Sequence, residues 1–187
     1  STFIESVMGK LMIINDTDTK VLTENRLDES INWWSSQLLS PNILRYPAPA
    51  IRFNNTKLLY PNIFCVHRLI HLMITNSALG ISSSQVGWPY GTFVINLPTV
   101  SWKRKLHVLA YPTLVYDSEY RTIFNEACLS TSGEYSINRR KKLIVTCYDV
   151  LRDTVCVIKS YSLFTACLQH EWDHNRGYLI LDRHGNS

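Results

Sequence analysis

Gln169-His170-Glu171-Trp172-Asp173-His174 is the stretch around which the rest of the chain is organised. Residues four apart lie one turn apart on the same face of a helix, so His170 and His174 can reach one metal ion. Glu171 points about 100° away from His170 around the helix, which places it beside such an ion. From there its carboxylate can act as a general base for a water molecule. The stretch therefore predicts a helix that carries part of a catalytic metal site.

The residues that flank this stretch predict where the helix begins and ends. Ser160 or Ser162 can cap its start, and Gly177 can end it. One helical face is shared by Leu163, Ala166, Cys167, His170 and His174. The alternative is a helix with two surface histidines, which so short a match allows. The apolar run that leads into the motif favours the metal site.

A catalytic metal site of this kind uses three protein ligands and keeps one position open. Asp182 and His184 follow the motif, but they lie in the last few residues, so the third ligand is expected upstream. Cys167 is seven residues from His174, about 10.5 Å along a helix, which bonds of about 2.0–2.3 Å to one ion do not easily span. Cys167 is therefore predicted to line the pocket beside the metal.

Cys128 is the better candidate for the third ligand. It follows a strand-like run over residues 120–124 and precedes a polar turn through Gly133, so that a thiolate there can be held rigidly. The other interpretation of a lone cysteine is a small buried hydrophobic residue. That interpretation is given to Cys65, Cys147 and Cys156.

Three ordered motifs of the chain resemble those of the peptide deformylase family. They are Gly80-Ile81-Ser82-Ser83-Ser84-Gln85, Glu126-Ala127-Cys128-Leu129-Ser130 and the stretch from Gln169 to His174, preceded by Ile43-Leu44-Arg45-Tyr46-Pro47. The resemblance covers most of the chain, from about Ile43 to Asp182. Any one motif alone is a weak signal, whereas three motifs in order are specific.

The resemblance implies an enzyme that removes the N-formyl group from the initiator methionine of nascent polypeptides. The implied ligands of one divalent metal ion are Cys128, His170 and His174. In the family this ion is typically iron(II), with zinc, nickel or cobalt substituting, whereas the ligand set alone indicates only a zinc-like site. Glu171 would be the base. The side chain of Gln85 and the backbone N–H of Leu129 would hold the oxyanion that develops on the formyl group.

A methionine side chain needs an unbranched apolar slot. We expect the slot to lie one turn before His170 and beside the backbone of Gly80, which allows close approach of a ligand. The residues expected to line and close it are Leu163, Ala166, Cys167, Leu79 and Phe124. The resemblance also implies that Arg139 or Arg140 pairs with Glu126.

The chain departs from the family pattern at four positions. Ala78 and Ala127 stand where glycine is usual, and Ser82 and Ser83 stand where alanine is usual. A methyl group at Ala127 could shift Cys128 or narrow the cleft if a positive φ is needed there, and packed serines need hydrogen-bond partners. The alternatives to an active deformylase are therefore a deformylase-like protein with altered substrate or weak activity, and a ribosome-associated binding protein with a structural metal.

Strands followed by a long helix indicate an α+β fold, with antiparallel β-sheets packed around a central C-terminal helix that carries the His-Glu-x-x-His motif. The predicted strands are 92–97, 106–110, 113–116, 143–148 and 154–158, with a hairpin connection over 149–153. Helices are predicted over 28–39 and 61–73, the second with His67 and His71 at the surface or partly buried. Arg139–Lys142 is predicted to be a solvated turn, with an RNA-facing patch as the alternative.

The composition is that of an ordinary globular protein, with 187 residues, 45% of them hydrophobic and 18% charged. It predicts one catalytic domain over 43–187, with 1–42 as an N-terminal extension of unknown role. No apolar run approaches about 18 residues, so no membrane span is expected. Five cysteines with a metal-type arrangement indicate a reducing compartment, and the extension favours an organellar, mitochondrial protein over a cytoplasmic one. The charge of +4 permits contact with a ribosome but predicts no specific nucleic-acid site, and a monomer is expected.

Overall fold

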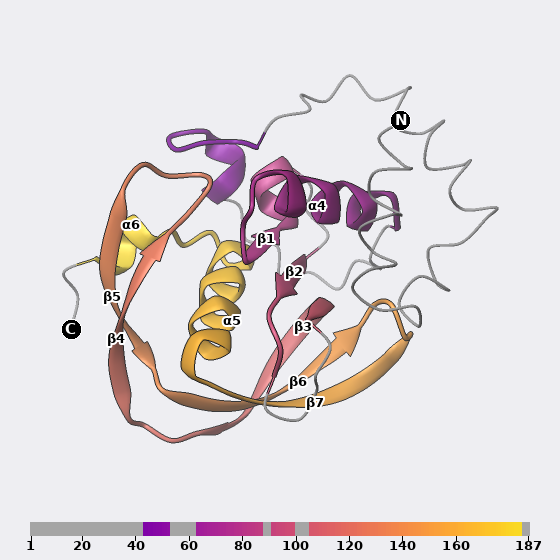
Figure 1. Cartoon of the computed structure of the whole chain (residues 1–187), viewed down its shortest axis with the longest axis vertical. Coiled ribbons are helices and arrows are strands. Elements are labelled where there is room, and N and C mark those ends of the chain that lie inside the picture. Colours follow the sequence, from indigo (N-terminus) through magenta and orange to yellow (C-terminus); the bar gives the residue numbers. More distant parts are fainter. Residues whose placement is uncertain (1–42, 53–62, 88–90, 100–104, 185–187) are drawn as a thin grey trace.

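The computed structural model describes residues 43–52, 63–87, 91–99 and 105–184, which Figure 1 shows in colour. Two antiparallel sheets curve around one long helix, α5 (Ser162–Asn175). This arrangement confirms the predicted α+β fold. The N-terminal extension and the helix predicted over 28–39 lie outside the described residues.

The larger sheet has five antiparallel strands in the order β1-β2-β3-β6-β7. Their bounds are β1 (Gly80–Ser82), β2 (Thr92–Asn96), β3 (Leu106–Asp117), β6 (Lys142–Asp149) and β7 (Thr154–Tyr161). Strand β3 unites two strands that the sequence predicts separately. Its register against β6 shifts between Ala110 and Thr113. Because Pro112 has no N–H to donate to the ladder, an irregularity at this point lets the strand continue past it.

The smaller sheet pairs β4 (Arg121–Ala127) with β5 (Glu134–Arg140). Strand β5 shows that the predicted solvated turn over Arg139–Lys142 is wrong for its first half. Ile137 and Arg139 both point inward along β5, and Arg139 is only 4% exposed. An arginine is tolerated in such a place only with charged partners, which two carboxylates near α5 provide.

The predicted end of α5 is confirmed, whereas its predicted cap is wrong. Gly177 has a φ of 82°, and its amide donates to the carbonyl oxygen of His174 at 3.1 Å. Tyr161, not a serine, precedes the first helical residue, and it makes no side-chain capping bond. The hydroxyl of Ser160 donates to the carbonyl oxygen of Leu143 at 3.4 Å. The hydroxyl of Ser160 therefore bonds to strand β6 and does not cap α5.

The core has two halves, one on each face of β2 and β3, because successive side chains of a strand point to opposite faces. Helix α5 covers one face in a cluster of Phe93, Ile95, Leu109, Leu143, Val145, Cys147, Ile158, Phe164 and Leu168. Helix α4 (Ile63–Thr75) covers the other with Val66, Leu69, Ile70, Met73, Ile81, Val94, Leu106 and Val108. Short helices η2 (Pro49–Arg52), η3 (Ser83–Val86) and α6 (Ile180–Arg183) complete the described fold. None of the described helices is long and apolar enough to cross a bilayer.

The two histidines of α4 differ in environment. His67 is 1% exposed, which corrects the expectation of a surface or partly buried residue, whereas His71 is half-buried as expected. Burial lowers the pKa of His67 to about 4. The folded chain therefore keeps this imidazole neutral at pH values where the unfolded chain already protonates it.

This difference predicts a loss of stability on the acid side of neutrality. The contribution of His67 is complete above its unfolded pKa of about 6.5 and is lost as the pH falls towards 4, where it should cost on the order of 2 kcal/mol of unfolding free energy. Urea unfolding at pH 7 and 4.5 measures this loss. His67→Gln should shrink it, while His71→Gln, the matched control, should keep it. Equal pH dependence in all three proteins would contradict the assignment.

Candidate active site

The three predicted ligands meet where β4 ends beside the middle of α5. The Cys128 Sγ lies 3.3 Å from the Nε2 of His174, which lies 3.2 Å from the Nε2 of His170. All three ligand atoms lie within 4.8 Å of one another. Asp182, considered as a downstream ligand, forms an ion pair with Arg52 instead. The structure therefore places Cys128, in the loop after β4, close to His170 and His174 of α5.

This cluster fits a bound metal ion. Bonds of about 2.0–2.3 Å in a tetrahedral arrangement separate ligand atoms by roughly 3.3–3.8 Å, close to the observed separations. The Nδ1 of His170 is taken by Glu126 at 2.9 Å, which leaves Nε2 for the centre of the cluster. One sulfur and two imidazole nitrogens form a donor set suited to a zinc-like transition metal.

The protonation of Cys128 suits metal binding, whereas that of His170 competes with it. Burial alone would raise the pKa of Cys128, but the charge of His174 and hydrogen bonds from both histidines outweigh it and lower that pKa to about 5. Burial lowers the pKa of His170, but its bonds to Cys128 and Glu126 outweigh this and raise it to about 10. The thiolate is the form that binds metals, and a metal ion bound here would have to displace the proton of His170.

A buried network of charged residues fixes the orientation of His170 through Nδ1, the ring nitrogen that does not face the cluster. Arg139 donates to both carboxylate oxygens of Glu126 at 2.9 Å, and also to Asp173 at 2.6 Å. Arg139, not Arg140, is therefore the partner of Glu126. Burial alone would raise the pKa of Glu126 and of Asp173, but their hydrogen bonds to cationic partners outweigh it and keep both below their ordinary values. The charged Glu126 fixes the orientation of the ring of His170.

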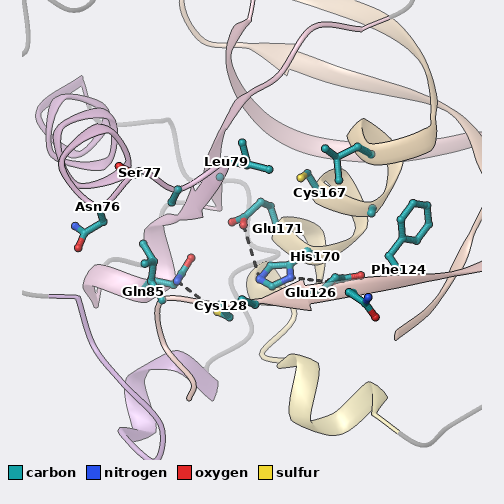
Figure 2. A pocket seen from close by; sticks show the side chains of 17 residues that line it. Asn76, Ser77, Leu79, Gln85, Phe124, Glu126, Cys128, Cys167, His170 and Glu171 are labelled. Atoms are coloured by element: carbon teal, nitrogen blue, oxygen red, sulfur yellow. Dashed lines mark hydrogen bonds and ion pairs between the residues drawn. The ribbon is translucent and has the colours of Figure 1, made fainter. Parts of the chain in front are cut away.

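Glu171 lies beside the cluster without joining it. Its side chain is 4% exposed, and its Oε1 lies 4.0 Å from the Nε2 of His170. Figure 2 shows the carboxylate next to that ring. Burial raises the pKa of Glu171 to about 7, and its Oε2 has no hydrogen-bond partner among the described residues. A carboxylate with a pKa near neutral pH can take up a proton and release it again.

Gly80 of β1 packs directly on Glu171 and predicts a sensitive position. A Cβ at Gly80 would lie 3.1 Å from Oε1 and 3.2 Å from Cγ of Glu171, and 3.1 Å from the carbonyl oxygen of Val94. The backbone of β2 can give little, so the carboxylate of Glu171 must shift by a few tenths of an ångström. We expect this displacement in Gly80→Ala to lower the kcat of the hydrolysis that the family resemblance implies by about tenfold to a hundredfold. Metal content should stay unchanged, because no ligand moves. Steady-state kinetics with metal analysis test this, and an unchanged kcat would contradict it.

Gln85 reaches the cluster from the opposite side, out of η3. It is 1% exposed, and its amide nitrogen donates to Ser130 Oγ at 3.1 Å and lies 3.8 Å from the Sγ of Cys128. Its Oε1 accepts the backbone N–H of Ser82 at 2.9 Å, which fixes the amide orientation. Leu129, the other predicted donor, follows Cys128 and lines the same cavity.

The segment Ile43–Pro47 ties the two loops of the site together. The amide of Leu44 donates to the carbonyl oxygen of Gln85 at 2.8 Å, and the amide of Tyr46 donates to that of Ser130 at 2.7 Å. Arg45 adds a bond from its guanidinium to the carbonyl oxygen of Leu129 at 3.1 Å. This explains why a stretch that supplies no cluster residue stands among the motifs.

A cavity of about 350 Å³ opens beside the cluster (Figure 2). The six residues predicted to contact substrate all line it, namely Leu79, Gly80, Phe124, Leu163, Ala166 and Cys167. Burial raises the pKa of Cys167 to about 12, so it forms a neutral wall. Sequence reasoning did not assign the lining residues Asn76, Ser77, Ala78 and Asn125 to the cavity. A signal for Asn76, Ser77 and Ala78 was present in the sequence: the apolar residues at helical spacing stop at these positions, just before the first motif.

The departures from the family pattern are accommodated locally. Ala127 ends β4, and neither it nor Ala78 has a positive φ, so their methyl groups require no strained backbone. The serines of the first motif are all buried and all hydrogen-bonded. Ser83 Oγ accepts the amide of Thr92 at 3.3 Å, and Ser84 Oγ donates to the carbonyl oxygen of His174 at 3.3 Å.

Ser82 forms the most informative of these bonds, because its hydroxyl donates to Asn175 Oδ1 at 2.9 Å inside the core. Ser82→Ala should destabilise the chain by about 1–3 kcal/mol, since it leaves a buried acceptor unsatisfied. Asn175→Leu should do the same to the serine hydroxyl. The double variant should be less destabilised than the sum of the two, because neither member of the Ser82–Asn175 bond is left unsatisfied, while the lost bond from Asn175 Nδ2 to the carbonyl oxygen of Gly91 is common to both Asn175 variants. Urea unfolding of all four proteins measures the coupling, and strict additivity would contradict it.

Comparison with known proteins adds evidence of a different kind. The peptide deformylase of Brucella suis biovar 1 (strain 1330) is 31% identical over 104 residues, which are 56% of this chain and 59% of that protein. That of Rhizobium meliloti (strain 1021) is 27% identical over 114 residues, 61% of this chain and 66% of that protein. The chain thus spans less than two thirds of the length of these two curated relatives.

A solved structure and a family-wide pattern extend the likeness. The peptide deformylase of Ehrlichia chaffeensis in complex with actinonin superimposes with a TM-score of 0.69 at 23% identity, covering 78% of this chain and 88% of that one. At this identity the match supports the fold alone. The sequence model of the family described as Polypeptide deformylase matches residues 40–187, well over half of the chain.

Proposed function

The chain belongs to the polypeptide deformylase family, and from this membership and the geometry of its site we propose that it hydrolyses the N-formyl group of nascent polypeptides. The products are formate and a free N-terminal methionine amine. One observation carries the proposal: the converging ligand atoms of Cys128, His170 and His174 lie beside a cavity whose lining includes Cys128, His170 and the buried Glu171, whose Oε2 has no partner among the described residues.

Cys128, His170 and His174 are the residues that would hold the metal ion. When bound, a divalent ion at this place supplies a Lewis acid that polarises a carbonyl and makes water more acidic. Glu126 and Arg139 keep His170 in the orientation that directs its Nε2 to the cluster. The cavity beside the ligands favours a catalytic site over a structural one, whose coordination is closed by protein.

Glu171 moves the protons of the reaction. Its carboxylate takes a proton from the attacking water, and the water oxygen forms the new bond to the formyl carbon. The same carboxylic acid then gives its proton to the amide nitrogen as the C–N bond breaks, so that the amine leaves neutral. A pKa raised by burial to about 7 suits both transfers.

Gln85 and Leu129 stabilise the charge that develops between these steps. The amide nitrogen of Gln85 carries two N–H groups: one donates to Ser130 Oγ, and the other can donate to an oxyanion beside the cluster, because the nitrogen lies 3.8 Å from the sulfur of Cys128. The backbone N–H of Leu129 belongs to the residue after the ligand. Fixed donors aimed at a developing oxyanion are worth about a hundredfold to a thousandfold in rate each.

The methionine side chain occupies the apolar end of the cavity. Leu163, Ala166 and Cys167 of α5 form one wall, and Phe124 of β4 lies beside them in the same lining. These side chains carry no charge, so they suit a flexible thioether. Leu163 is 47% exposed, which leaves a route for the rest of the peptide to extend outward.

The proposal is tested with N-formyl-Met-Ala-Ser and anaerobically prepared, iron-loaded chain. Release of a primary amine in parallel with formate is the expected result. N-acetyl-Met-Ala-Ser is the control, and a bound inhibitor gives a second readout: actinonin, present in the Ehrlichia structure, should raise the melting temperature of the loaded chain. Metal-loaded, folded chain that releases no formate would overturn the proposal.

The finer parts of the proposal are the metal, the oligomeric state and the location. Iron(II) is favoured by the family resemblance, and a monomer suffices for a site whose three candidate ligands all belong to one chain. The residues ahead of the family match favour an organelle, the mitochondrion, over the cytoplasm. Metal analysis of protein purified without oxygen, light scattering and cell fractionation test these three points separately.

A further inference from the structure

The side of α5 that faces away from the active site lines a second hollow, of about 290 Å³. Gln169, Trp172, Asp173 and Arg176 recur at the spacing of one helical face, and all four line this hollow. Strand β5 forms the opposite wall, held to the helix because Gln169 exchanges two hydrogen bonds with the backbone of Arg140, at 3.0 and 2.8 Å. Figure 1 shows β4 and β5 passing beside α5.

A further hollow adjoins the first and shares Arg121 with it. It is lined by Ser118, Tyr120, Arg121, Lys141, Lys142 and Tyr161. The turns on either side are joined, because the amide of Lys141 donates to Tyr120 at 2.8 Å and that of Ser118 donates to Lys142 at 3.2 Å. We call the two hollows together the cationic groove.

Positive charge predominates in the cationic groove. Its accessible cations are Arg121, Arg140, Lys141, Lys142, Arg176 and Arg183. The carboxylates nearby are Asp117, Glu119 and Asp173, while the buried Arg139 is balanced by Glu126. Arg140 pairs with Asp117 at 2.9 Å. Arg176 and Arg183 bond to Asp173 at 2.7 and 3.0 Å. The three guanidinium side chains nevertheless remain 41%, 38% and 39% exposed. A guanidinium has five N–H donors, so each keeps donors for a further acceptor.

Aromatic rings lie among these cations. Tyr120 is 75% exposed and Tyr161 is 42% exposed in the second hollow. The guanidinium of Arg176 lies 5.3 Å from the ring centroid of Trp172, and that of Arg183 lies 4.8 Å from that of Tyr178. The hydroxyl of Ser118 lines the second hollow and has no partner among the described residues. Cations interleaved with exposed rings are the pattern of single-stranded nucleic-acid binding, in which phosphates pair and bases stack.

We propose that the cationic groove binds the backbone of single-stranded RNA, without base specificity. An acidic peptide satisfies the charges but gives no stacking for Tyr120 and Tyr161. A flat lipid surface does not enter two joined hollows. The groove and the active site use different faces of α5, so this inference does not depend on the proposed hydrolysis.

Fluorescence anisotropy with a labelled 12-nucleotide RNA tests the proposal. Four neutralised phosphates predict that log K falls with log salt with a slope of about −3, since single strands release about 0.7 counterion per contact. Lys141→Glu with Lys142→Glu should weaken binding at least about tenfold and flatten the slope by about 1.4, which is two contacts at about 0.7 each. Tyr120→Ala should weaken binding with the slope unchanged. Lys105→Glu, at the other end of β3, is the matched control and should bind as the parent does.

Two further arms make the result decisive. The Lys141/Lys142 variant should keep its melting temperature and its turnover of formyl peptide, which separates this surface from the active site. If this variant does not fold, Lys141→Gln with Lys142→Gln takes its place. The proposal is overturned if poly-glutamate or anionic vesicles bind as tightly as RNA. It is also overturned if RNA fails to bind at about 50 mM salt, where phosphate contacts are strong, or if the lysine variant binds RNA like the control.

Discussion

Glu171→Gln should reduce turnover of N-formyl-Met-Ala-Ser by about a hundredfold to ten-thousandfold while the metal stays bound. The range is that of general acid–base catalysis by a positioned side chain. Glutamine has nearly the same shape, but it cannot accept a proton. Glu126, another carboxylate near the cluster, does not replace Glu171, because its oxygens are bonded to Arg139 and His170. The expected loss falls in kcat, with little change in KM.

Two measurements make this result specific to proton transfer. Metal content should match the parent chain, since Glu171 lies beside the ligands and is not one of them. The melting temperature should not fall, because the amide fills the space of a buried carboxylate whose Oε2 has no partner among the described residues. Turnover at the parent rate would rule out Glu171 as the base.

Cys128→Ala should weaken metal binding by more than about a hundredfold. Loss of a residue that only supports a ligand costs up to about a hundredfold in metal affinity, and loss of the ligand itself should cost more. The thiol supplies the only sulfur of the cluster, and the remaining histidines leave a two-ligand site. Competition with a chelator of known affinity measures the change. Turnover should be lost with the metal.

Cys167→Ala is the matched control for that experiment. This cysteine also lines the cavity, but it is absent from the group of converging ligand atoms. Its removal should leave metal affinity unchanged and alter only KM, through the wall of the methionine slot. Equal loss of metal in both variants would show that the two thiols share the site, and would contradict a ligand set of Cys128, His170 and His174.

The parts of the site that could be predicted are those set by local spacing or by ordered motifs. His170 and His174 share a helical face because of their separation in sequence, and Gly177 ends the helix because it readily adopts a positive φ. The distance along a helix was enough to set Cys167 aside as a ligand. The choice of Cys128 needed the order of three motifs, since no local rule brings a loop to a helix 42 residues later.

The parts that could not be predicted depend on tertiary partners. Arg139 reads as solvated in a run of four basic residues, and only Glu126 and Asp173, distant in sequence, make its burial possible. His67 is buried in a helix that packs on β1 and β2, whereas its spacing with His71 suggests a pair with a common environment. Ser160 has a side chain that can cap a helix, but in the fold its hydroxyl donates to a carbonyl oxygen of β6, which the sequence alone does not place beside it.

X-ray absorption spectroscopy of the zinc-loaded chain tests the central claim most directly. The geometry predicts one sulfur neighbour at about 2.3 Å and two imidazole nitrogens at about 2.0–2.1 Å, with one lighter atom completing the sphere. The sulfur should vanish in Cys128→Ala and persist in Cys167→Ala. A metal surrounded only by nitrogen and oxygen in the parent chain would contradict the convergence of loop and helix on which the whole account rests.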